Sequence, residues 1–293
     1  MSVVRLSLLS SAVALAVAGC GGGAEFGATG TLSLGITDAP VDGAKHVYVQ
    51  FSSLELHGPD GTRTITFGAP KQIDLLALSG GLSLPLLEGQ TLTAGHYQWI
   101  RLNVDTDGTL DTYLVADDID ETVHELTIPS NAETGLKLVR GFDVPAGGSA
   151  DFTIDFDLRK SLVESSGGYH LKPVLRIEDN VEVGAVAGEV DLGVYSCNTT
   201  GNAVYVFSGH DATLADINTS LTTGPVTTAD VKAHEDGSYH YRAAFLAPGA
   251  YTVALTCDVE SDTAEDTESL SFAKSYNVTV TADEVTSQSF TSL

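Results

Sequence analysis

Short runs in which apolar and polar residues alternate constrain the fold of this chain more than any other feature of its sequence. Because successive side chains of a strand point to opposite faces, a period of two predicts strands with one buried face and one wet face. Gly, Pro, Asp and Asn separate the runs, and these residues favour turns. The sequence therefore predicts an all-β fold, and the one short helical candidate is a single turn over residues 74–78. The clearest runs are Leu32, Leu34 and Ile36; Val47, Val49 and Phe51; and Phe152, Ile154, Phe156 and Leu158, which alternate with Asp151, Thr153, Asp155 and Asp157.

The character of the sequence changes near Gly184. Beyond Val181 it becomes rich in Gly, Thr and Ser and poor in basic residues. The chain has 293 residues, of which 43% are hydrophobic, enough for two cores of ordinary size. We therefore expect two tandem β-sandwich-like domains, over residues 30–183 and 184–293.

The first 19 residues have the pattern of an export signal. One basic residue, Arg5, precedes an apolar run over residues 6–18, and small residues follow. The run is too short to span a membrane comfortably. We predict that the chain is cut before Cys20, and that the Gly- and Ala-rich residues 20–29 form a flexible tether.

The residues Val17-Ala18-Gly19-Cys20 resemble the lipobox of bacterial lipoproteins. The resemblance implies that Cys20 carries lipid, and more than one acyl chain anchors a protein stably. It also implies that the membrane is a partner and the cell envelope the location, with the outer membrane favoured in a Gram-negative cell because Gly follows the cysteine. The alternative is an ordinary signal peptide that ends near a cysteine.

Cys197 and Cys257 remain as an even pair once Cys20 is assigned to lipid. In an oxidising compartment such a pair predicts a disulfide, which would close a long loop and stabilise the fold by roughly 3–5 kcal/mol. Two separate buried thiols are the alternative.

The formal net charge is −25, from 39 acidic and 14 basic residues. Proteins that bind nucleic acid need a basic surface, so this charge argues against a nucleic-acid partner.

Acidic residues gather at three places. Asp105, Asp107 and Asp111 surround Gly108 at the spacing that begins a calcium loop, but the late Glu of such a loop is missing. Weak calcium binding is one interpretation, and a hairpin turn with solvated carboxylates is the other. The second and third groups, also interpreted as solvated loops or weak cation sites, are Asp117, Asp118, Asp120 and Glu121, and Asp258, Glu260, Asp262, Glu265, Asp266 and Glu268.

Motifs for catalysis or for a resident cofactor are missing from the sequence. It holds no Gly-x-Ser-x-Gly, P-loop, Rossmann glycine pattern, His-Glu-x-x-His or Cys-x-x-Cys motif. His234 and His240, with Asp236 between them, come nearest to a metal site, but we interpret them as a turn before a strand. We predict a protein that is not an enzyme and has no cofactor.

Tyr97 and Trp99 fall on the same face of a predicted strand. Exposed aromatic rings in this arrangement would stack on sugar rings, whereas the alternative is that they fill a sandwich core.

Six motifs occur in a fixed order and together resemble the bacterial family of domain of unknown function 4382, over about residues 29–180. The resemblance implies an exported, β-rich module and no assigned activity. The motifs are Thr37-Asp38-Ala39-Pro40-Val41-Asp42, Ser53-Leu54-Glu55-Leu56-His57, Ile73-Asp74-Leu75-Leu76, Ala94-Gly95-His96-Tyr97, Gly135-Leu136-Lys137-Leu138-Val139 and Phe156-Asp157-Leu158-Arg159-Lys160-Ser161.

The C-terminal half is similar to the carboxypeptidase regulatory-like, transthyretin-type sandwich. The resemblance rests on Gly188-Glu189-Val190, the run over residues 203–207, Gly237-Ser238-Tyr239-His240-Tyr241 and the run over residues 246–253. It implies a second β-sandwich.

Taken together, these features predict a non-catalytic, envelope-anchored lipoprotein that acts as a binding or structural module at the cell surface or in the periplasm. Its expected partner is an envelope protein or a glycan, and a carbohydrate-binding or adhesion protein is the alternative. A hydrolase accessory or an enzyme would require a cleft with convergent carboxylates such as Asp105 and Asp107.

Overall fold

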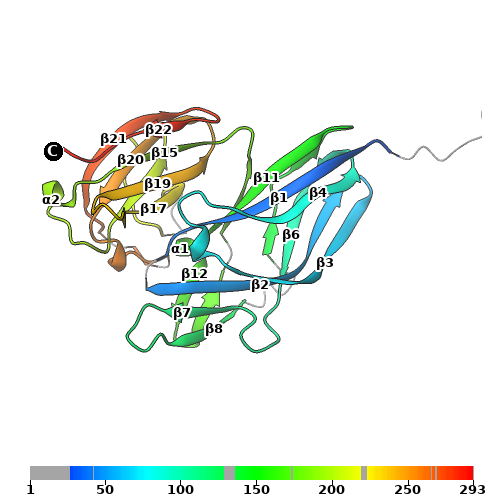
Figure 1. The fold of residues 1–293 in the computed structure, drawn as a ribbon, viewed down its shortest axis with the longest axis horizontal. Helices are drawn as coiled ribbons and strands as arrows, with labels where there is room; N and C mark the ends of the chain where they lie inside the picture. Colours follow the sequence, from blue (N-terminus) through cyan, green and yellow to red (C-terminus); the bar gives the residue numbers. More distant parts are fainter. Residues whose placement is uncertain are drawn as a thin grey trace, which may run out of the picture.

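Strands dominate the computed structural model, which describes residues 27–41, 43–128, 136–172, 174–218, 223–264, 266–267 and 269–292 (Figure 1). The prediction of an all-β fold is confirmed. The expected turn at residues 74–78 is the 3₁₀ turn η1 (Leu76–Leu78), and the other helical segments are equally short: α1 (Leu158–Ser161), α2 (Leu192–Tyr195) and η3 (Val259–Ser261). In the described part of the chain, no helix is long and apolar enough to cross a membrane.

Two sheets built from β1 to β14 make up most of the first half of the chain, and we call them the N-terminal sheets. The first has the order β14-β11-β1-β4, in which β1 and β11 run parallel and the other pairs are antiparallel. Its strands are β1 (Thr29–Ala39), β4 (Leu84–Thr93), β11 (Ser149–Asp157) and β14 (Leu175–Asp179).

The second N-terminal sheet is built around β2 (Ala44–Gly58). One edge of β2 pairs with β3, and the other edge pairs with β6 over one part of its length and with β7 over another. The sheet has the order β12-β13-β8-β7-β2-β6-β9, and β5 pairs with β10 separately. The remaining strands are β3 (Gly61–Asp74), β5 (Gly95–Tyr97), β6 (Trp99–Val104), β7 (Tyr113–Ala116), β8 (Val123–Thr127), β9 (Leu136–Leu138), β10 (Phe142–Val144), β12 (Leu162–Ser165) and β13 (Gly168–Leu171).

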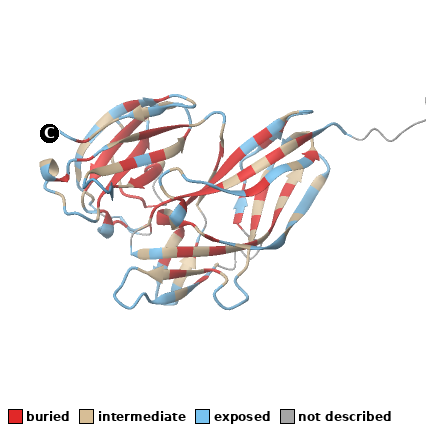
Figure 2. Ribbon diagram, viewed as in Figure 1, coloured by how far each residue is buried: buried red, intermediate tan, exposed pale blue. Residues whose placement is uncertain are grey.

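Alternation positions the core of the N-terminal sheets as expected. The apolar residues of the first two runs are all fully buried: Leu32, Leu34, Ile36, Val47, Val49 and Phe51. Figure 2 shows the resulting bands of buried and less buried residues along β1 and β2. Each buried aliphatic or aromatic side chain contributes roughly 1.5–3 kcal/mol, so this stripe is a main source of stability.

Two four-stranded sheets form the second half of the chain, and we call them the C-terminal sheets. Their orders are β18-β19-β15-β22 and β17-β16-β20-β21, and among the described residues they share no strand with the N-terminal sheets. Tyr241 and Tyr251 are buried within them, so these rings fill a core. The strands are β15 (Gly184–Glu189), β16 (Ala203–Ser208), β17 (Thr227–Asp230), β18 (Lys232–Ala233), β19 (Tyr239–Leu246), β20 (Gly249–Thr256), β21 (Phe272–Val280) and β22 (Val285–Ser287).

The polar face of β11 departs from the predicted pattern beyond Asp151, which is exposed as expected. Thr153, Asp155 and Asp157 are 1–4% exposed, as deeply buried as the apolar residues between them. Asp155 lines a small cavity together with Thr228 of β17 and Ala243 of β19, so the C-terminal sheets cover this face. The third alternating run therefore predicts the strand and the exposure of Asp151 correctly, and the exposure of Thr153, Asp155 and Asp157 wrongly.

The predicted disulfide between Cys197 and Cys257 is present, with the two Cα atoms 5.3 Å apart. Cys197 follows α2, and Cys257 directly follows β20. Because 60 residues of sequence separate the cysteines, the bond removes much of the conformational freedom of the unfolded chain.

Replacing both cysteines, Cys197→Ser with Cys257→Ser, should lower the free energy of unfolding by about 2–4 kcal/mol, because the unfolded chain regains that freedom. Urea denaturation followed by circular dichroism measures the change. A reductant should bring the wild-type protein to the midpoint of the double variant and leave the variant unmoved. Equal midpoints for oxidised wild type and variant would contradict the stabilising role.

Candidate functional site

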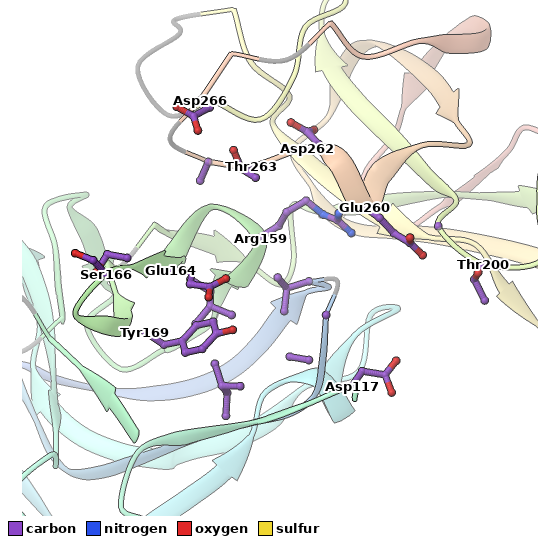
Figure 3. Close-up of a pocket in the computed structure, with 18 residues that line it drawn as sticks. Asp117, Arg159, Glu164, Ser166, Tyr169, Thr200, Glu260, Asp262, Thr263 and Asp266 are labelled. Atoms are coloured by element: carbon purple, nitrogen blue, oxygen red, sulfur yellow. The ribbon is translucent and has the colours of Figure 1, made fainter. Parts of the chain in front are cut away.

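A cleft of about 1090 Å³ lies between the N-terminal and C-terminal sheets. On one wall are Glu164 of β12, Tyr169 of β13 and Asp117 of the β7–β8 connection. The other wall carries Glu260 of η3, Asp262 and Asp266, and Figure 3 shows Arg159 between the two walls. The two acidic groups that the sequence places more than 130 positions apart thus face one another, with Asp117 from one and Glu260, Asp262 and Asp266 from the other.

Asp262 is the most buried carboxylate on the wall that also carries Glu260 and Asp266, and its exposure is 8%. It accepts hydrogen bonds from the Tyr205 hydroxyl and from the Ile217 backbone N–H. Burial raises the pKa of the Asp262 carboxyl, while the hydrogen bond from Tyr205 opposes that change. Asp262 therefore anchors the wall, and the exposed Glu260 and Asp266 present charge to the opening.

The acidic residues between β7 and β8 also stabilise the loop that carries them. Asp118 accepts hydrogen bonds from the Asp120 and Thr122 N–H groups, and hydrogen bonds from Thr122 lower the pKa of Asp118. Glu121 forms an ion pair with Lys45. These contacts hold the turn and leave Asp117 at the cleft.

Next to the cleft, a set of buried and half-buried charged residues lies where the two groups of sheets meet, and we call it the joint cluster: Asp38, Asp155, Asp157, Arg159, Lys160, Arg176 and Asp230. The parallel pairing of β1 with β11 sets Asp38 opposite Phe156 and Ala39 opposite Asp157, so two of the predicted motifs begin side by side. At the end of β11 the chain turns into α1, whose first turn Asp157 caps by accepting the Lys160 N–H.

One ion pair of the joint cluster, Arg159 with Asp230, crosses from one group of sheets to the other, and hydrogen bonds to Thr228 and Pro225 cross beside it. The Arg159 side chain is 2% exposed, and its guanidinium donates to the Asp230 carboxylate at 3.1 Å and to the Thr228 hydroxyl at 3.2 Å, both in β17. Lys160 pairs with Asp157 at 3.1 Å and donates to the Pro225 carbonyl. Arg176 of β14 donates its Nε–H to Asp155 at 3.1 Å.

Among the residues that the structure describes, Asp38 forms no ion pair with a cation. One carboxylate oxygen accepts the Leu158 N–H at 3.3 Å, and the other is buried and has no hydrogen-bond partner among the described residues. Burial raises the pKa of the Asp38 carboxyl well above its usual range, and the charges of Asp155 and Asp157 raise it further.

Residues 29–173 match DUF4382, a domain of unknown function. The resemblance expected for this region is confirmed, and the joint cluster draws Asp38, Asp155, Asp157, Arg159 and Lys160 from the DUF4382 region. No curated protein matches the chain.

Solved structures that match the chain are distant. A leucine-rich repeat protein from Bacteroides thetaiotaomicron is 15% identical with a TM-score of 0.24, and the match covers 90% of this chain and 26% of that one. The Bacillus anthracis TIE protein is 10% identical with a TM-score of 0.19, over 89% and 33%. A putative cell adhesion protein from Bacteroides fragilis is 11% identical with a TM-score of 0.23, over 88% and 91%. The chain thus spans about a third or less of the first two proteins, and similarity this low carries no functional argument.

The three carboxylates proposed for calcium lie in the DUF4382 region, outside both cavities described above. Asp105 accepts a hydrogen bond from the Gln50 side chain, and Asp111 accepts one from the Gly108 N–H within the same loop. Asp107 is exposed. In residues that the structure describes, no three His, Cys, Asp or Glu side chains gather as a metal would need, and calcium binding here stays a prediction.

The hairpin alternative for this loop is wrong. Strands β6 and β7 both pair with β2, and residues 105–112 leave that sheet edge and return to it. The Thr112 hydroxyl donates to the Asp105 carbonyl at 2.8 Å and closes the excursion.

Tyr97 does not offer its ring to a ligand. It is 4% exposed, stacks on Phe142 and donates its hydroxyl to the Thr93 carbonyl, so the prediction of ligand stacking is wrong for Tyr97. The reason is that Tyr97 belongs to β5, which pairs with β10, and not to the strand of Trp99.

Trp99 is half-buried, and side chains from the two adjoining strands contact its ring. The His57 ring of β2 lies parallel to it at 5.4 Å, and the Lys137 ammonium of β9 lies 4.4 Å from its centroid. Because β6 lies between β2 and β9, these groups approach from opposite sides. A sugar would have to displace one of them.

Cys20, the predicted lipid site, lies outside the described residues.

Replacing Asp38 with Asn should change the free energy of unfolding differently at different pH values. Compared with the wild type, the variant should gain stability as the pH rises from 4 to 8. A carboxyl whose pKa is raised in the folded state stabilises that state while protonated, and this contribution is lost as pH rises from about 4 through the raised pKa. The gap in free energy of unfolding between Asp38→Asn and wild type should grow by at least about 1 kcal/mol over this range. Urea denaturation at several pH values measures it.

The exposed Asp107→Asn substitution makes the same chemical change at the surface and provides the control, so the effect of Asp38 is read as the difference between the two variants at each pH. A difference that stays flat with pH would show that Asp38 does not titrate in this range.

Proposed function

We propose that this chain is an envelope-anchored lipoprotein that binds a partner without catalysing a reaction, and that the cleft between its two groups of sheets is the binding site. The observation that carries the proposal is the cleft of about 1090 Å³ with carboxylates on both walls. A cleft of this size accommodates a peptide segment or a ligand of comparable volume.

The charge of the walls favours a partner that carries positive charge. Asp117 and Glu164 face Glu260 and Asp266, whereas Arg159, the cation among the described lining residues, is committed to Asp230. Carboxylates on facing walls repel one another, and a cationic segment inserted between them relieves that repulsion. We therefore propose a Lys- or Arg-rich segment of another envelope protein as the partner.

The domain arrangement is part of the proposal. We propose that residues 30–183 and 184–293 are separate domains, supported by the separate hydrophobic clusters of the two groups of sheets. For the second domain we propose a transthyretin-type sandwich, because it consists of two four-stranded sheets. The joint cluster would hold the two domains so that the cleft walls face one another.

The double substitution Glu260→Gln with Asp266→Asn should weaken binding of a synthetic Lys-rich peptide by about tenfold, equivalent to about 1.4 kcal/mol, because it removes two charges from one wall. Isothermal titration calorimetry at physiological ionic strength measures the affinity. The matched control, Asp107→Asn with Asp283→Asn, removes two exposed charges that do not line the cleft.

The control should change the affinity less than twofold. Equal losses in the two double variants would mean that the peptide responds to net charge alone, and the cleft would then not be its site.

Replacing Cys20 with Ala should release the protein from the membrane pellet into the soluble fraction, because no cysteine then remains to carry lipid before the tether. Fractionation of cells followed by immunoblotting measures the distribution. The Cys197→Ser variant, which lacks the disulfide and keeps Cys20, should stay in the pellet. Retention of the Cys20→Ala variant in the membrane would refute the anchor.

A further inference from the structure

Three side chains stand in a row across the outer face of one C-terminal sheet. In the order β15, β19, β18, the residue pairs Glu189 with His240 and His240 with Lys232 are in register. Directly paired residues share a face, with Cβ atoms about 4.5–5.5 Å apart. The next residue, Tyr241, is buried in the core, so the face that carries Glu189 and His240 points to solvent.

His234 joins this row from the turn between β18 and β19. The turn is closed by the His234 N–H, which donates to the Ser238 carbonyl at 2.8 Å, and by the Gly237 N–H, which donates to the His234 carbonyl at 3.0 Å. Gly237 has a φ of 85°, a conformation that glycine adopts without strain. The turn sets the centroids of the His234 and His240 rings 4.3 Å apart, inclined at 50°.

The hydrogen bonds of His240 leave one of its nitrogens available. The Ser238 hydroxyl lies 2.5 Å from the Asp236 carboxylate and 2.8 Å from His240 Nε2. A hydroxyl has one proton, and a carboxylate is the stronger acceptor, so Ser238 donates to Asp236 and accepts from His240 Nε2–H. In the neutral ring the lone pair then resides on Nδ1. An outer hydrogen bond of this kind is how proteins orient metal-binding histidines.

The Lys232 ammonium does not compete with a ligand for Nδ1 of His240. Its ammonium donates to the Ser79 hydroxyl at 2.6 Å, which draws the side chain toward the N-terminal sheets. His234 is exposed, and no hydrogen bond to its ring is found in the part of the chain that the structure describes.

We propose that His234, His240 and Glu189 bind a divalent transition-metal ion, with Zn²⁺ as the ion that suits two imidazoles and a carboxylate best. Two imidazoles on one Zn²⁺ have ring centres about 5 Å apart, given metal–nitrogen bonds of about 2.0–2.1 Å. The observed 4.3 Å requires small side-chain rotations. The described residues contain no set of three ligands already gathered, so Glu189, which is exposed, closes the site by rotating, and water fills the remaining positions.

Titration of ZnCl₂ into the full chain carrying Cys20→Ala tests the site. That variant has no free thiol, because the other two cysteines form the disulfide. We expect one Zn²⁺ per chain, and zinc anomalous scattering from soaked crystals should place it between His234 and His240. His234→Ala and His240→Ala should each lower the affinity at least about tenfold, and Ser238→Ala should lower it by about tenfold through loss of the outer hydrogen bond.

His96→Ala is the matched control, because His96 is exposed and pairs with Asp143 away from this sheet. It should leave the affinity unchanged. Failure of the parent protein to bind Zn²⁺ at one to one, or a loss in His96→Ala equal to that in His234→Ala, would overturn the proposal. Circular dichroism of each variant establishes that a loss of binding is not a loss of fold.

Discussion

The ion pair between Arg159, just beyond the end of β11, and Asp230 of β17 is the interaction on which the arrangement of the two groups of sheets depends. Arg159 is almost fully buried and reaches from α1 to Asp230 and Thr228 of β17. A buried ion pair adds little to stability compared with apolar residues of the same size, because desolvation costs nearly as much as the attraction returns. Breaking one is costly, by roughly 3–5 kcal/mol, because it leaves a charge uncompensated in the interior. Such a pair therefore favours one relative position of the sheets over others.

That position creates the cleft. With Arg159 held against β17, the β12–β13 hairpin and the β7–β8 connection on one side face η3 and the residues after it on the other. The disulfide supports the second wall, since Cys257 immediately precedes the segment that carries Glu260 and Asp262. Acidic side chains that would simply be solvated on an isolated loop thereby become two facing surfaces with a common preference for positive charge.

Asp38 shows that the same cluster is not fully neutralised. Its second carboxylate oxygen is buried without a partner in the described part of the structure, next to Asp155 and Asp157. Carboxylates grouped in a protein interior favour protonation of one member, because burial and mutual repulsion both penalise the charged form. Proton uptake at Asp38 is therefore linked to the stability of the fold.

Local patterns in the sequence determine the strands, the single turn at residues 76–78 and the pairing of Cys197 with Cys257, because each depends on neighbouring residues or on elimination among three cysteines. Tertiary structure alone decides that Asp155 and Asp157 of β11 are buried, that Tyr97 belongs to a different strand pair from Trp99, and that Asp117 faces Glu260. A period of two reports which face of a strand is apolar, but it does not report what covers the other face. Where distant segments meet depends on strand order and on the packing of sheet against sheet, and no short stretch of sequence contains that information.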